Sequence, residues 1–116
     1  MKTKRFHHIF DLEDCNQKIN DPKILRDFLE ELVKKVKMSI LEGPIIAQGK
    51  PENPGFSAVA IIDFSHVSIH TFANSKEVLI DVFSCKEYDK EKVLKLCKKY
   101  FASSTTKVRQ KEVWWG

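Results

Sequence analysis

The sequence predicts an α+β fold, a two-layer sandwich in which two helices pack on one face of a mostly antiparallel sheet. Three features support this prediction. Two segments repeat apolar residues with the period of an amphipathic helix. Six other segments have the composition of strands, and turn-rich stretches separate most of them. The predicted order is strand, helix, four strands, helix and strand.

The N-terminal part opens with a strand over residues 6–12, which are rich in aromatic and β-branched side chains. Asp21 and Pro22 then begin the first helix, because aspartate is a good N-cap and proline is favoured at the first helical position. The apolar stripe of this helix runs as far as Leu41, and the pair Gly43–Pro44 predicts its end.

The rest of the chain alternates strand and turn signals before the second helix. Residues 56–62 are almost wholly apolar, which indicates a central strand, whereas residues 66–72 alternate between two faces. Asp89 caps the second helix, whose apolar stripe ends at Phe101. The remaining expected elements are a short strand, a loop, a strand and a final strand at residues 45–48, 49–55, 77–84 and 105–115.

Composition excludes several classes of protein. The 116 residues suit one domain, 1–116, with 42% hydrophobic and 31% charged residues and a mildly basic net charge of +4. Cys15, Cys85 and Cys97 are too widely spaced for a disulfide framework or a metal knuckle, so we expect a cytoplasmic protein. No apolar run approaches the roughly 18 residues of a membrane helix, so no membrane partner is expected.

The unusual segment is 63–71, where two strands meet with a serine at the join and two histidines after it. A serine at a backbone bend can attack its preceding carbonyl, and a nearby histidine can move the proton. His66, Ser68 and His70 share one strand face at about 7 Å spacing. An ordinary strand with polar residues facing solvent explains this pattern too. A zinc site of His66, His70 and Cys85 lacks a fourth ligand, so we expect no metal.

Two segments resemble a known family. Ser65–Thr71 reads Ser-His-Val-Ser-Ile-His-Thr, and Asp81–Cys85 reads Asp-Val-Phe-Ser-Cys. They resemble the prokaryotic S-adenosylmethionine decarboxylase proenzymes, which typically read Glu-Ser-His-(Ile/Leu)-(Ser/Thr)-Ile-His-Thr-Trp-Pro-Glu and later Asp-(Val/Leu)-Phe-Thr-Cys. The likeness covers nearly the whole chain, since further matching positions are Asp11, Cys15, Phe56–Ala58 and Lys107–Arg109.

The resemblance implies a self-processing enzyme with a two-layer sandwich fold. Ser65 would attack the carbonyl of Phe64, and β-elimination of the resulting ester would split the chain between these two residues. The products would be a β chain, 1–64, and an α chain, 65–116, whose first residue becomes a pyruvoyl group made from Ser65.

The resemblance also assigns roles to three other residues. His70 would be the base for the elimination, Ser57 would hydrogen-bond the rearranging backbone, and Cys85 would protonate the decarboxylated carbon. The pyruvoyl carbonyl would form a Schiff base with the α-amine of a small cationic amino-acid-type substrate and accept electrons as CO₂ leaves. Prokaryotic members pair two processed protomers, which implies a homodimer. The implied substrate is S-adenosylmethionine, which feeds spermidine and other polyamine biosynthesis.

The expected substrate-binding residues depart from the family pattern. Phe64 stands where the family usually has glutamate, and Phe72 and Asn74 replace its tryptophan and second glutamate. Both glutamate losses remove negative charge from a site for a cationic substrate, although Asp63 restores one charge if it points inward. Two alternatives follow: a pyruvoyl decarboxylase of arginine or ornithine, and an unprocessed relative that binds a ligand or a partner without catalysis.

Two C-terminal features have less specific meanings. Basic residues there would suit nucleic acid, but a solvated helix face and a strand edge explain them equally well. No RNA-binding motif with stacking aromatics is present, so no nucleic-acid partner is expected. Trp114 and Trp115 are expected to pack on the core or across a dimer interface. The basic residues are Lys90, Lys92, Lys95, Lys98, Lys99, Lys107, Arg109 and Lys111.

Overall fold

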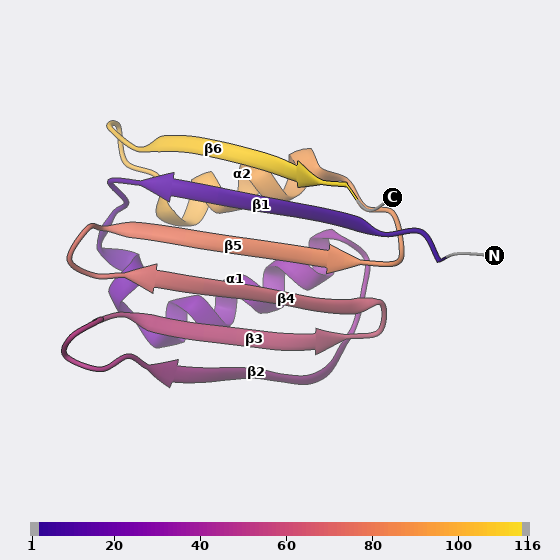
Figure 1. Ribbon diagram of the computed structural model, residues 1–116, viewed down its shortest axis with the longest axis horizontal. Coiled ribbons are helices and arrows are strands. Elements are labelled where there is room, and N and C mark those ends of the chain that lie inside the picture. The colour runs from indigo at the N-terminus through magenta and orange to yellow at the C-terminus, as the bar shows by residue number, and fades with distance from the viewer. Residues whose placement is uncertain (1–2, 115–116) are drawn as a thin grey trace.

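The computed structural model describes residues 3–114, which form one antiparallel sheet covered on one face by two helices (Figure 1). The strands of the described chain lie in the order β2-β3-β4-β5-β1-β6. This arrangement confirms the predicted fold class and the predicted order of elements. The elements are β1 (Phe6–Glu13), η1 (Gln17–Asn20), α1 (Pro22–Lys35), β2 (Ile40–Gln48), β3 (Phe56–Ile62), β4 (Ser65–Phe72), β5 (Glu77–Ser84), α2 (Lys90–Phe101) and β6 (Lys107–Val113).

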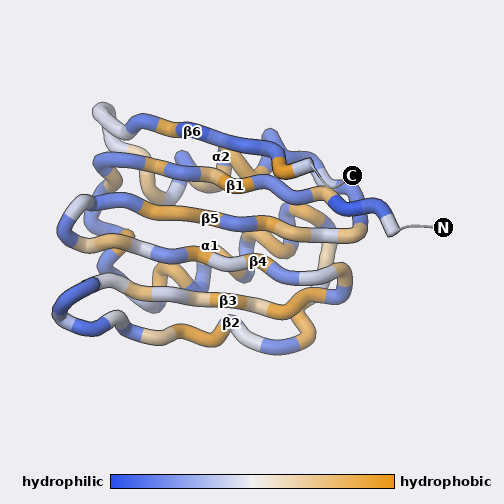
Figure 2. The backbone as a smooth tube through the Cα atoms, viewed as in Figure 1, coloured by the Kyte–Doolittle hydropathy of each residue, from blue (hydrophilic) through white to orange (hydrophobic). Residues whose placement is uncertain are grey.

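The core lies between the sheet and the helices. Every second residue of β3, β4 and β5 is buried, so one face of each strand packs inward. Phe10, Phe28 and Phe101 are fully buried, and the last two rings lie 4.9 Å apart. Burying each such side chain stabilises the fold by roughly 1.5–3 kcal/mol. Figure 2 shows the corresponding alternation of hydrophobic and hydrophilic residues, whereas β6 is largely hydrophilic.

The first helix begins as predicted but ends earlier. The carboxylate of Asp21 accepts from the backbone N–H of Lys23, and Pro22 occupies the first turn. The prediction that the helix runs through Leu41 to the Gly43–Pro44 pair is wrong. Lys37 has a φ of 60°, and the N–H of Met38 donates to the carbonyl of Val33. These contacts form a Schellman motif, which closes the helix without a glycine.

The pair Gly43–Pro44 lies inside β2, in a bulge against β3. Gly43 has a φ of +97°, and a Cβ on it would lie 2.8 Å from the carbonyl oxygen of Val59. Only glycine fits this close approach, so here it serves a strand irregularity and not a helix end. The short strand predicted at 45–48 therefore extends back to Ile40.

The other boundaries lie within two residues of their predicted positions. β3 and β5 have the predicted bounds, and β4 begins one residue early, at Ser65. β6 begins at Lys107, two residues later than predicted. Thr105 and Thr106, which were predicted to belong to this strand, hydrogen-bond Asp14 across a turn. Trp114 is 83% exposed and does not pack on the core, so its packing across a dimer interface stays a prediction. Trp115 lies outside the described residues. Neither described helix is long and apolar enough to cross a membrane.

Candidate active site

The sheet face opposite the helices carries part of the candidate site. His66, Ser68 and His70 alternate along β4 with inward-facing buried residues, so they share this open face as predicted. A hydrogen-bonded pair on neighbouring strands shares it as well: Nε2 of His7 lies 2.8 Å from Oδ1 of Asp81. No local pattern in the sequence predicts this pair, because 74 residues separate its members.

Ser65 lies at the first position of β4, after a two-residue turn that follows β3. Its φ is 143°, a conformation that a residue with a Cβ rarely adopts. The carbonyl oxygen of the preceding Phe64 accepts a hydrogen bond of 2.9 Å from the backbone N–H of Cys85. The Phe64–Ser65 peptide is therefore held at a strained turn, with its carbonyl polarised by a fixed donor.

A cationic side chain, that of Lys86, lies beside this peptide. The Phe64 ring is half-buried against the core, and Nζ of Lys86 lies 5.1 Å from its centroid. That ammonium also donates to the carbonyl of Lys37 at 3.2 Å. Asp63 does not restore a negative charge to the open face, because its carboxylate accepts from the backbone N–H of Ser39 between α1 and β2.

Ser57 and His70 form a second group at the other end of the β3–β4 hairpin. They are opposite each other in the strand register, and Oγ of Ser57 lies 2.7 Å from Nδ1 of His70. Ser65 is five residues from His70 along β4, which places the two Cα atoms about 17 Å apart. Within one chain, the structure thus brings Ser57 to His70 but brings neither of them to Ser65.

The three free cysteines have very different surroundings. Cys85 is exposed directly after β5, whereas Cys15 and Cys97 are buried. Burial raises the pKa of Cys15 to about 11 and that of Cys97 to about 12. Both buried thiols therefore stay protonated and inaccessible, which leaves Cys85 as the thiol able to act on a ligand.

Comparison with known proteins gives this geometry its context. The family model described as S-adenosylmethionine decarboxylase matches residues 6–112. The chain belongs to the S-adenosylmethionine decarboxylase family. It is 28% identical over 113 residues to the S-adenosylmethionine decarboxylase proenzyme of Clostridium botulinum strain Langeland, covering 95% of this chain and 94% of that protein.

Another relative and a solved structure agree. The S-adenosylmethionine decarboxylase proenzyme of Prochlorococcus marinus strain MIT 9313 is 31% identical over 80 residues, which cover 68% of this chain and 62% of that protein. The crystal structure of the adenosylmethionine decarboxylase from Aquifex aeolicus VF5 has a TM-score of 0.76 at 23% identity, covering 96% of this chain and 91% of that one. This likeness shows a common fold.

Two of the three residues expected to bind substrate in this S-adenosylmethionine decarboxylase family member lie far from Ser65. Phe72 is half-buried at the end of β4, and Asn74 is exposed in the following turn. Both are therefore at the same end of the hairpin as His70. Phe64 alone of the three is next to Ser65. Within residues 3–114, no group of three or more histidine, cysteine or acidic side chains could hold a metal ion.

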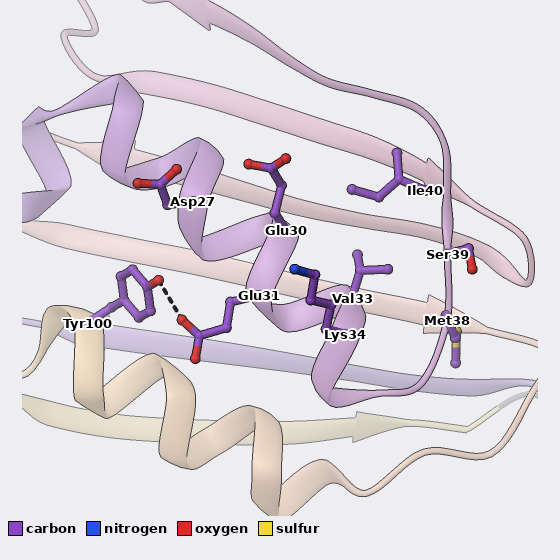
Figure 3. A pocket seen from close by; sticks show the side chains of 9 residues that line it. All are labelled: Asp27, Glu30, Glu31, Val33, Lys34, Met38, Ser39, Ile40 and Tyr100. Atoms are coloured by element: carbon purple, nitrogen blue, oxygen red, sulfur yellow. Dashed lines mark hydrogen bonds between the residues drawn. The ribbon is translucent and has the colours of Figure 1, made fainter.

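A hollow of about 610 Å³ lies on the helix side of the sheet (Figure 3). Asp27, Glu30 and Glu31 line it from α1, and the hydroxyl of Tyr100 donates to Glu31 at 2.7 Å. None of the four catalytic candidates lines this hollow. This hollow is therefore separate from the candidate catalytic residues.

Proposed function

We propose that this protein is a self-processing, pyruvoyl-dependent decarboxylase whose first candidate substrate is S-adenosylmethionine. The main supporting observation is the Phe64–Ser65 peptide. Its serine has a φ of 143°, and its carbonyl oxygen is held by the N–H of Cys85 at 2.9 Å. Relief of backbone strain favours rearrangement at this peptide bond, and the fixed donor stabilises charge on the oxygen.

Processing would proceed in two stages. Oγ of Ser65 attacks the carbonyl carbon of Phe64, and the N–H of Cys85 stabilises the negative oxygen before the C–N bond breaks and leaves an ester. A base then removes the α-proton of Ser65, and the carboxylate of Phe64 leaves. Tautomerisation and hydrolysis release ammonia, so chain 65–116 begins with a pyruvoyl group and chain 1–64 ends in a carboxylate.

His70 is suited to be that base, but only if it comes from a second protomer. Its Nδ1 is 2.7 Å from Ser57, and this pair is about 17 Å from Ser65 in its own chain. If two sheets stack with a two-fold axis running across the strands, the Ser57–His70 end of one protomer lies over the Ser65 end of its partner. Each processing site would then combine residues of both chains.

Exposed apolar side chains support such a homodimer. Ile45 of β2 and its cross-strand neighbour Val59 are 61% and 38% exposed, and Ile61 is 49% exposed. They project from the open face, where Val59 and Ile61 alternate with buried residues of β3. Contiguous exposed apolar residues of this kind favour burial against another surface. A second copy of the chain would cover them while completing the processing sites.

A pyruvoyl group made from Ser65 would supply the electron sink that loss of CO₂ from an α-amino acid substrate needs. Ser65 is its only necessary precursor, and the described geometry fits its formation at the start of β4. The exposed Cys85 is next to this position, because its N–H contacts Phe64, so its thiol is suited to protonate the α-carbon after decarboxylation. Free thiols such as Cys85 suit a reducing cytoplasm, where the product would serve polyamine biosynthesis.

One observation favours a second candidate substrate. The family's glutamate at the position of Asn74 accepts two hydrogen bonds from a ribose, whereas an asparagine amide has one acceptor oxygen. Asn74 is exposed in the turn after β4. An amino acid without a ribose, such as arginine or ornithine, would not need the missing glutamate.

The proposed function is tested by CO₂ release. Fully cleaved protein is incubated separately with carboxyl-labelled S-adenosylmethionine, arginine and ornithine, with the Ser65→Ala variant as the control. Release from S-adenosylmethionine that the variant does not show supports the first candidate, and release from arginine or ornithine alone supports the second. If cleaved protein releases no CO₂ from any of the three, these substrate assignments are wrong.

A further inference from the structure

Tyr88 lies in the loop that joins β5 to α2, three residues after Cys85. Its hydroxyl donates to the carbonyl of Val82 at 2.9 Å and is hydrogen-bonded to Nδ1 of His8 at 2.7 Å. The carbonyl of Phe6 lies 3.4 Å away. One half-buried hydroxyl thus connects the loop to both β5 and β1, at the end of the sheet where β1 begins (Figure 1).

His8 extends this connection to the edge strand. The imidazole of His8 is buried, packs edge-on against the Tyr88 ring at 5.3 Å, and places its Nε2 3.1 Å from the carboxylate of Glu112 in β6. Burial also raises the pKa of the Tyr88 hydroxyl well above its usual range, so that hydroxyl keeps its proton. The Tyr88 hydroxyl can therefore donate to the carbonyl of Val82 at neutral pH.

The opposite end of the loop is fixed by Ser84. Its fully buried hydroxyl accepts from the N–H of Lys86 at 2.9 Å and donates to the carbonyl of Lys86 at 2.8 Å. Cys85 lies between these two anchors, and its side chain is exposed. The orientation of its N–H toward Phe64 therefore depends on how the loop is held.

We propose that Tyr88 is a positioning residue, whose hydroxyl, through His8 and Val82, fixes the loop so that the N–H and thiol of Cys85 face the Phe64–Ser65 peptide. This inference rests on the proposed function for its catalytic meaning. Loss of the hydroxyl frees the loop at one anchor while Ser84 holds the other. The distance from the Cys85 N–H to the Phe64 carbonyl then fluctuates, so the oxyanion is less well stabilised.

The chain offers a matched pair of variants, Tyr88→Phe and Tyr100→Phe. Both remove one tyrosine hydroxyl with a hydrogen-bond partner, but the hydroxyl of Tyr100 contacts Glu31 on the helix side of the sheet. We expect Tyr88→Phe to slow self-cleavage of newly synthesised chain by roughly fivefold to tenfold, the effect of one lost hydrogen bond. Tyr100→Phe should cleave at the wild-type rate. Equal cleavage rates for Tyr88→Phe and wild type would overturn the proposal.

A second measurement separates this proposal from the proposed function. In the uncleaved Ser65→Ala chain, adding Tyr88→Phe should accelerate hydrogen exchange of the Cys85 amide and change the pH profile of Cys85 alkylation, whereas adding Tyr100→Phe should change neither. Unchanged exchange and alkylation would contradict the positioning role. If wild type never cleaves, the proposed function fails, but these readouts still decide whether Tyr88 positions Cys85.

If Tyr88→Phe fails to fold, two variants of His8 test the same proposal. The amide nitrogen of an asparagine is placed near Nδ1 of a histidine, so His8→Asn retains a partner for Tyr88, whereas His8→Gln reaches toward Glu112 instead. We expect exchange of the Cys85 amide to accelerate in His8→Gln and to stay near the wild-type value in His8→Asn. The opposite order would contradict the proposal.

Discussion

The separation of His70 from Ser65 makes a prediction about mixed dimers. The Ser65→Ala variant keeps a working base but has no nucleophile, and His70→Ala keeps the nucleophile but has no base. Each variant alone should stay uncleaved or cleave very slowly. When the two are mixed, one site per mixed dimer contains Ser65 from one chain and His70 from the other, and it should cleave.

The magnitude follows from the strand register. The gap of about 17 Å between Ser65 and His70 in one chain is several times the reach of a hydrogen bond, so the base cannot act within its own chain. After random exchange of an equal mixture, about half of the His70→Ala chains have a Ser65→Ala partner. About half of the His70→Ala chains should therefore be cleaved, and none of the Ser65→Ala chains.

The assay is intact-mass analysis of two variants that carry affinity tags of different mass. The tags show which chain is cleaved, and capture through one tag shows that mixed dimers form. Cleavage of His70→Ala alone at the wild-type rate would refute the shared site. Absence of cleavage in a sample with demonstrated mixed dimers would refute it too.

Three other predictions follow from exposure and charge. Iodoacetamide should add one label to the native chain, at Cys85, and three after unfolding; intact mass showing more than one native label would contradict this. Burial lowers the pKa of His8 below 6.5, so the unfolded chain binds its proton more readily. The free energy of unfolding should therefore fall as pH drops below about 6.5 in urea titrations, and His8→Phe should lessen that fall. Ile45→Glu should yield monomers by light scattering, with little change in thermal midpoint, whereas the exposed-site control Gln17→Glu should stay dimeric. A stable Ile45→Glu dimer would argue against the open-face interface.

The sequence predicted element starts better than element ends. Asp21 and Asp89 cap their helices as expected, because a side chain that satisfies free N–H groups is a local signal. The end of α1 was not predicted, because Lys37 adopts a left-handed conformation and a lysine in a sequence does not indicate one. The Gly43–Pro44 pair looked like a helix end but serves a bulge, since its role depends on the neighbouring strand.

The candidate site shows the same division between local and non-local information. The Ser57–His70 contact was within reach of the sequence, because a two-residue turn that pairs Ile62 with Ser65 also pairs Ser57 with His70. The contact of Cys85 with Phe64 was not, because it depends on where β5 ends against β4. The hydrogen bond between Tyr88 and His8 joins residues that are 80 positions apart, so no local pattern in the sequence predicts it.

The central claim is that the chain cleaves itself between Phe64 and Ser65, and denaturing mass spectrometry of purified protein tests it most directly. The account predicts two fragments, 1–64 and 65–116, the second lighter by one ammonia than a hydrolysis fragment with an N-terminal serine. The Ser65→Ala variant should stay whole. An intact chain of 13.5 kDa after prolonged incubation of the wild-type protein would contradict the account.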